Sequence, residues 1–145
     1  MHIPGLDQRA PAVLLIVVLA TLAAAQQAYQ PKFAGDPAHS EAEAAALGYM
    51  RTAVMAEKLY QRKHASYATT LAGLVGSGSF TRRMVDPNRG DYTVGFHGRK
   101  ESYTLTMTPQ TFDAEHRAFW VNENGIIHYE TDKPATQESP VLKAD

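Results

Sequence analysis

The chain has 145 residues, of which 44% are hydrophobic and 20% charged, a composition typical of a single globular domain that buries a core. Its 14 basic and 15 acidic residues give a formal net charge of −1, which excludes a generally basic nucleic-acid binder and an acidic disordered chain. The absence of cysteine excludes disulfide bonds, thiolate nucleophiles and cysteine-ligated metal sites.

The first 25 residues have the pattern of a secretory signal. Arg9 precedes an apolar run over residues 12–25, about 14 residues where a membrane-spanning helix needs roughly 20. The run ends in three alanines that form an A-x-A cleavage site before Gln26. We predict a signal peptide over residues 1–25 and export through the inner membrane to the periplasm, the cell surface or the medium. The alternative is an uncleaved segment, residues 12–25, that anchors the protein in the membrane.

A linker and then a helix follow this segment. Residues 26–39 are rich in proline and glycine, which favours irregular structure. Ser40-Glu41-Ala42-Glu43 is a capping box, whose hydroxyl and carboxylate satisfy free amides at a helix start. Apolar residues then recur at three- and four-residue spacings, which predicts an amphipathic helix to about His64. Gly48 costs about 1 kcal/mol relative to alanine inside a helix and indicates close approach of another backbone.

Beyond the helix the hydrophobic pattern changes to that of short strands. Runs rich in β-branched and aromatic residues, bounded by Gly, Pro, Asn or Asp, cover residues 92–96, 102–108, 118–122 and 126–130. Asn122-Glu123-Asn124-Gly125 predicts a tight turn between the last two. We therefore predict an α+β domain over residues 40–142, with one amphipathic N-terminal helix packed on a small antiparallel sheet of about four strands. Residues 143–145 form a tail.

The order and spacing of these segments resemble type IV pilin-like and type II secretion pseudopilin-like proteins. The matching segments, in chain order, are residues 47–52 (LGYMRT), 56–60 (AEKLY), 66–67 (SY), 70–74 (TLAGL), 84–86 (MVD), 90–94 (GDYTV), 103–106 (YTLT), 117–121 (RAFWV), 124–129 (NGIIHY) and 139–142 (SPVL). The resemblance implies a pilin-like fold and a non-enzymatic structural or interaction role in a pilus or secretion apparatus. It also implies protein partners in the cell envelope, either pilin or secretion components.

The leader of this chain departs from the pattern of that family. Gly5 is followed by Leu6 rather than phenylalanine, no glutamate precedes the apolar run, and prolines interrupt the path to Ser40. In the family a continuous apolar helix serves as membrane anchor and filament core. The resemblance therefore implies the globular head alone, which contacts a membrane only if the N-terminal segment stays uncleaved.

No motif in the sequence predicts a catalytic, metal or cofactor-binding residue. The histidines lie far apart, without the H-x-x-x-H or H-E-x-x-H spacing that places two ligands on one helical face. No G-x-S-x-G turn is present, and the glycine-rich residues 73–79 lack the Lys-Ser/Thr ending of a phosphate loop. We therefore expect that the protein is not an enzyme.

An alternative function rests on basic residues around the first predicted hairpin. These residues, together with nearby aromatic side chains, have the chemistry that holds single-stranded nucleic acid or another anionic polymer. The candidate polyanion-binding residues are Arg82, Arg83, Arg89, Arg99 and Lys100. Asp86, Asp91 and Glu101 dilute this charge, so ordinary solvated surface charges are the competing interpretation.

Overall fold

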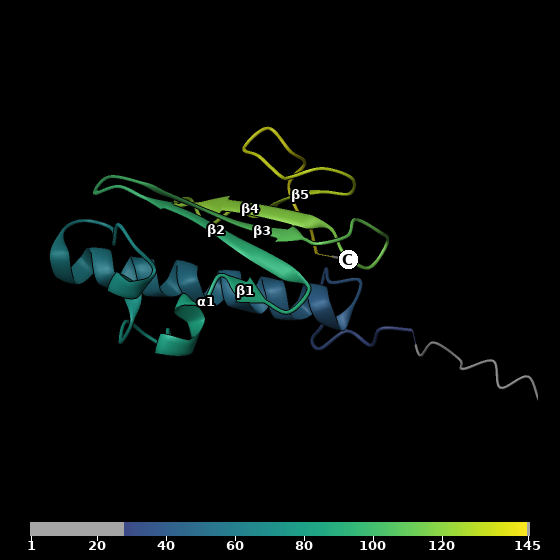
Figure 1. Ribbon diagram of the computed structural model, residues 1–145, viewed down its shortest axis with the longest axis horizontal. Helices are drawn as coiled ribbons and strands as arrows, with labels where there is room; N and C mark the ends of the chain where they lie inside the picture. Colours follow the sequence, from purple (N-terminus) through teal and green to yellow (C-terminus); the bar gives the residue numbers. More distant parts are fainter. Residues whose placement is uncertain (1–27, 145) are drawn as a thin grey trace, which may run out of the picture.

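The computed structural model describes residues 28–144, which form an α+β structure (Figure 1). A single long helix, α1 (Glu41–His64), lies along one face of an antiparallel sheet. The strands follow the order β1-β2-β3-β4-β5, so each pairs with its neighbours in sequence. Their bounds are β1 Asn88–Arg89, β2 Tyr92–Gly98, β3 Tyr103–Pro109, β4 Ala118–Asn122 and β5 His128–Glu130. Two short 3-10 helices, η1 (Ala72–Leu74) and η2 (Arg82–Val85), connect α1 to the sheet.

The predicted α+β class, with one helix and an antiparallel sheet, is confirmed, but the strand count of about four is wrong. The sheet has five strands, because β1 adds a two-residue edge that pairs Asn88 with Thr93 and Arg89 with Tyr92. Two residues are too few to carry a recognisable alternation, so no periodic signal marked this strand. The helix is the first regular element of residues 28–144, but it starts at residue 41 and is N-terminal only in that sense.

Both ends of α1 form where the local sequence favours them. The Ser40 side-chain oxygen accepts a hydrogen bond from the Glu43 amide at 3.1 Å, which caps the first turn. At the other end Ala65 adopts a left-handed conformation with φ 56°, and its N–H donates to the Gln61 carbonyl at 2.8 Å. Acidic residues in the first turn and basic residues in the last complement the helix dipole.

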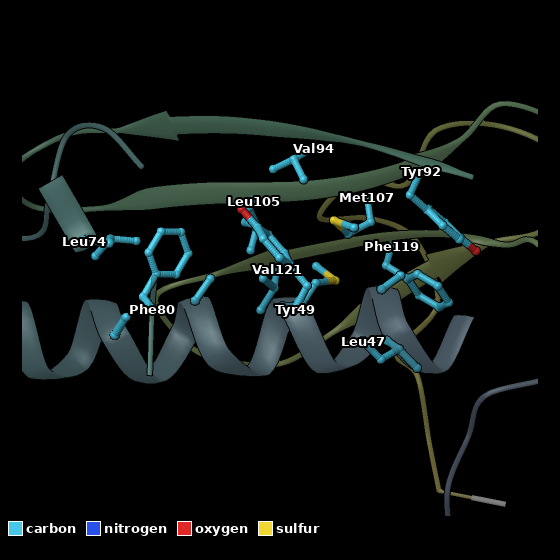
Figure 2. Packing of buried hydrophobic residues seen from close by; sticks show 14 of the residues in the cluster. Leu47, Tyr49, Leu74, Phe80, Tyr92, Val94, Leu105, Met107, Phe119 and Val121 are labelled. Carbon is cyan, nitrogen blue, oxygen red and sulfur yellow. The ribbon is translucent and has the colours of Figure 1, made fainter. Parts of the chain in front are cut away.

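The core lies between α1 and the sheet face that turns toward it (Figure 2). In β3 the buried Tyr103, Leu105 and Met107 alternate with half-buried threonines on the opposite face, as the sequence predicted. Leu47 and Met50 of α1 are fully buried in one cluster with Leu105 and Met107 and with apolar side chains of β4. Each such side chain contributes about 1.5–3 kcal/mol to folding, so this interface is the main source of stability.

Gly48 does not mark a close approach, and that prediction is wrong. It lies on the exposed side of α1, and a Cβ atom placed there would meet nothing within 4 Å. We expect Gly48→Ala to raise the free energy of unfolding by about 1 kcal/mol, because alanine loses less backbone entropy in a helix. Urea denaturation measures the change. The matched control is Gly125→Ala, which should destabilise because Gly125 has φ 74°; a destabilised Gly48→Ala would contradict the prediction.

The segment before α1 is irregular but fixed around one carboxylate. Asp36 is buried and accepts hydrogen bonds from the Tyr29 hydroxyl and from the amides of Lys32 and Ala38. The stretch predicted as a linker thus includes an ordered turn that leads the chain into the helix.

The signal peptide and its anchoring alternative lie outside the described residues. Within residues 28–144, no helix combines the length and apolarity that crossing a membrane requires.

Candidate functional site

The densest group of buried polar residues surrounds the start of α1. Glu43 is completely buried, and its two carboxylate oxygens accept hydrogen bonds from Arg117 Nε at 3.1 and 3.2 Å and from Arg117 Nη2 at 2.8 Å. They also accept from the backbone amides of His39 at 3.0 Å and Arg117 at 2.8 Å. The capping-box glutamate therefore reaches the His39 amide and joins α1 to the residue before β4. Sequence reasoning assigned Glu43 the cap but found no signal for Arg117, which is 74 residues away.

Arg117 is held from several sides. Its Nη2 atom also donates to the Pro37 carbonyl at 2.7 Å, and its guanidinium carbon lies 5.1 Å from the centre of the Tyr129 ring and 5.7 Å from that of Phe119. Burial pushes the pKa of the Glu43 carboxyl upward, but the hydrogen bonds from Arg117 and His39 outweigh it and hold that pKa below its ordinary value. Glu43 is therefore a saturated carboxylate with a structural role.

A second polar group, formed by His116 and two aspartates, lies next to this ion pair. His116 Nδ1 lies 2.8 Å from Asp113 Oδ1, and Nε2 lies 3.0 Å from Asp91 Oδ2. Burial alone would lower the pKa of His116, but the hydrogen bonds with Asp113 and Asp91 raise it. Because both ring nitrogens are engaged by carboxylates, His116 joins the β1–β2 turn to the β3–β4 loop and offers no free nitrogen for base catalysis or metal binding.

This arrangement predicts a pH-dependent contribution of His116 to stability. Because the pKa of His116 is raised in the folded state, its stabilising contribution is complete below pH 6.5, the ordinary pKa of histidine. The contribution is lost as the pH rises through the pKa of His116 in the folded state. We expect His116→Gln to be less stable than wild type at pH 5.5 by less than about 1 kcal/mol, since the aspartates are largely solvated. At pH 8.5 the difference should shrink. Melting temperatures at the two pH values test this, and a constant difference would contradict it.

A cavity of about 740 Å³ opens beside His116 at the start of α1. Among its lining residues are Tyr29, His39, Glu41, Asp91 and Glu115. Ser40 also lines this cavity. Its hydroxyl donates to the Glu115 carbonyl and accepts from the backbone amide of Glu43, so it is not positioned as a nucleophile. Within residues 28–144 no three or more His, Cys, Asp or Glu side chains gather as metal ligands. The cavity therefore supports no catalytic assignment.

The five candidate polyanion-binding residues lie in two separate groups. Arg89 pairs with Tyr92 at the start of β2, whereas Arg99 and Lys100 follow its last residue, roughly 20 Å away along a seven-residue strand. Arg82 and Arg83 belong to η2, and Arg89 Nη1 donates to the Arg83 carbonyl at 3.0 Å. The Arg89 guanidinium is also 4.9 Å from the ring centre of Tyr49.

The second group, Arg99 and Lys100, has basic neighbours that the sequence did not indicate. The Tyr67 amide donates to the Lys100 carbonyl at 2.9 Å, and the β2–β3 hairpin turn lies at the same end of the molecule as the last turn of α1 (Figure 1). The last turn of α1 carries Arg62 and Lys63, which are exposed. We call Arg62, Lys63, Arg99 and Lys100 the cationic end. Only folding brings these distant pairs to one end of the domain.

Comparison of this chain with protein-family models, with curated proteins and with solved structures finds no match. Its class therefore follows from its own fold and polar groups. Residues 28–144 form a small α+β domain with the long helix α1 on one face of a five-stranded antiparallel meander. Its most buried ion pair, among the described residues, fixes the start of that helix.

Proposed function

We propose that this chain is an exported, non-enzymatic pilin-like domain that serves as a structural or interaction accessory of a pilus or secretion apparatus. The observation that carries the proposal is the 24-residue helix α1 laid along one face of a single antiparallel sheet. This is the arrangement that the resemblance to pilin and pseudopilin heads implies. The saturated Glu43–Arg117 and His116 groups support a structural interpretation of its buried polar residues.

Exposed apolar residues beside α1 suit contact with a protein partner. Phe33 and Ile126 are 52% and 51% exposed and line a shallow groove of about 290 Å³ together with Arg51. The Arg51 guanidinium carbon lies 5.5 Å from the ring centre of Phe33. Apolar side chains flanked by an arginine are the composition favoured at protein interfaces. The partner in this proposal is a pilin or secretion component of the cell envelope.

Site-specific photo-crosslinking in the native cell tests this proposal. A photoreactive amino acid at position 126 should give an adduct that mass spectrometry identifies as a pilin or secretion component. The control carries the same group at position 133, where Lys133 is exposed outside the groove. Equal adducts at both positions, or no adduct, would count against the proposal. The N-terminal residue of the recovered protein tests export separately, since cleavage after residue 25 leaves Gln26.

The cationic end favours a second candidate function, a small exported protein that grips nucleic acid or another anionic polymer. Four exposed cations, from the last turn of α1 and from the β2–β3 turn, lie at the same end of the domain (Figure 1), and the exposed Glu101 follows Lys100 directly. Fluorescence anisotropy with a labelled single-stranded oligonucleotide tests it. Affinity should fall steeply with salt, and Arg99→Ala and Lys100→Ala should each reduce the salt slope by about 1. Arg82→Ala and Arg83→Ala, in the other group, are the matched comparison. No binding at physiological salt would exclude this function.

A further inference from the structure

The carboxyl group of Glu57, in the C-terminal half of α1, is buried with no cation paired to it in the part of the chain that the structure describes. Its side chain is 0% exposed, and Oε2 accepts a hydrogen bond from the Ala68 amide at 2.9 Å. Oε1 has no hydrogen-bond partner among the described residues, and Glu57 belongs to none of the ion pairs found there. Since burial without a paired charge disfavours the ionised form, this environment suits the neutral acid.

Tyr103 is a titratable group that lies close enough to Glu57 to feel its charge. Tyr103 of β3 is buried, and its hydroxyl likewise has no hydrogen-bond partner within residues 28–144. Tyr67, just after α1, packs edge-on against it with ring centres 5.2 Å apart. Burial, together with the negative charges of Glu57 and Glu123, raises the pKa of Tyr103, so this hydroxyl stays neutral. Lys58, the next residue of α1, is exposed. Among the described residues, no cation pairs with a Glu57 carboxylate.

The residue that hydrogen-bonds to Glu57 lies between the helix and the sheet. Residues 67–69, which we call the Ala68 segment, follow the left-handed turn at Ala65 that ends α1. A Cβ atom at Gly98 of β2 would lie 2.5 Å from the Ala68 carbonyl oxygen, so the segment packs directly on the end of that strand. The Tyr67 amide also bonds to Lys100 in the β2–β3 turn. The hydrogen bond from Ala68 to Glu57 thus joins α1 to the hairpin end.

We propose that Glu57 is a pH-sensitive latch, which as the neutral acid holds the Ala68 segment and the hairpin end against α1 and when ionised loosens this junction. Ionisation leaves a buried carboxylate with one backbone donor, and water reaches that charge if the Ala68 segment moves away. Such local opening increases the exposure of Tyr67 and Tyr103 while the Glu43–Arg117 end of the helix stays closed. This inference concerns regulation and does not depend on the proposed partner.

The linkage between ionisation and stability determines whether Glu57 stabilises the fold at low or at high pH. Burial raises the pKa of Glu57 from 4.5 to about 7, although the hydrogen bond from Ala68 acts in the opposite direction. The folded state therefore binds this proton more tightly than the unfolded state does. The stabilising contribution is complete below pH 4.5 and is lost as the pH rises through about 7.

A carbon-13 NMR titration of the Glu57 carboxyl in the full chain is the first test. A midpoint near 7 is the expected result. A midpoint near the ordinary value of 4.5 would overturn the proposal, because the group would then be ionised throughout the neutral range. This measurement needs no variant, so it stands even if substitutions at this position impair folding.

Amide hydrogen exchange at Ala68 is the second test. After correction for the intrinsic rate, protection in the wild type should fall at least about tenfold between pH 5.5 and pH 8.5. Glu57→Gln cannot ionise, so its protection should be the same at both values. Glu123→Gln and His116→Gln are controls that should retain the wild-type loss, since His116 titrates in the same range at the other end of the helix. A pH-dependent loss that persists in Glu57→Gln would overturn the latch.

Discussion

Replacement of Arg117 by alanine is expected to lower the free energy of unfolding by about 3–5 kcal/mol, the cost of leaving a buried charge unpaired. Glu43 is fully buried, and Arg117 supplies three side-chain hydrogen bonds to it. Without the guanidinium, the carboxylate keeps only the amides of His39 and residue 117 as donors. Urea denaturation at pH 7 measures the change.

The pH dependence of this effect distinguishes a charge effect from lost packing. The pKa of Glu43 is held below its ordinary value of 4.5, so the ion pair contributes fully above that pH and loses its contribution as the pH falls through the folded-state value. The stability gap between wild type and Arg117→Ala should therefore narrow under acidic conditions. A gap that is independent of pH would point to packing alone.

Two further variants complete this test. The double replacement Glu43→Leu with Arg117→Met removes both charges and should recover much of the loss, because apolar pairs often substitute well for buried ion pairs. The surface pair between Lys32 and Glu41 is the matched control, since its side chains are 56% and 74% exposed. Glu41→Gln should lower the free energy of unfolding by less than about 1 kcal/mol, the combined effect of an exposed ion pair and the helix dipole. A large loss of stability in Glu41→Gln would show that the urea measurement overstates the contribution of ion pairs.

Replacement of Phe80 by alanine is expected to cost about 3–5 kcal/mol, the usual range for a buried phenylalanine. Phe80 is 1% exposed and packs edge-on against Tyr49 of α1, with ring centres 6.1 Å apart (Figure 2). It anchors the connection between α1 and the sheet to the side of the helix. Thermal and urea denaturation measure the loss. Phe33→Ala is the control, because Phe33 is 52% exposed and should change stability by less than about 1 kcal/mol. Equal losses would contradict the assignment of Phe80 to the core.

The two ends of α1 are held by chemically different contacts. At its start a permanently charged arginine neutralises Glu43, so that junction is insensitive to pH in the neutral range. Toward its end Glu57 has a single amide donor and no cation among the described residues. A change in pH near 7 would therefore act on the Ala68 segment and the cationic end while the Arg117 junction stays intact. The domain can in this way have one fixed end and one adjustable end.

The sequence by itself determined the elements that depend on local chemistry. The capping box at Ser40 and the three- and four-residue apolar spacing gave α1 its bounds, since capping and amphipathic periodicity act within one or two turns. The alternation of Tyr103, Leu105 and Met107 with threonines likewise determined which face of β3 is buried. These signals require no knowledge of distant residues.

Only the tertiary structure decided which distant groups meet. The sequence predicted a capping role for Glu43, but folding buries both Glu43 and Glu57 completely. Folding places the Arg117 guanidinium against Glu43 but only the Ala68 amide against Glu57. This difference lowers the pKa of Glu43 and leaves burial to raise that of Glu57. A local pattern does not specify which side chain arrives from 74 residues away, because that depends on how helix and sheet pack. For the same reason, only folding brings Lys100 of the β2–β3 turn against Tyr67, which follows α1.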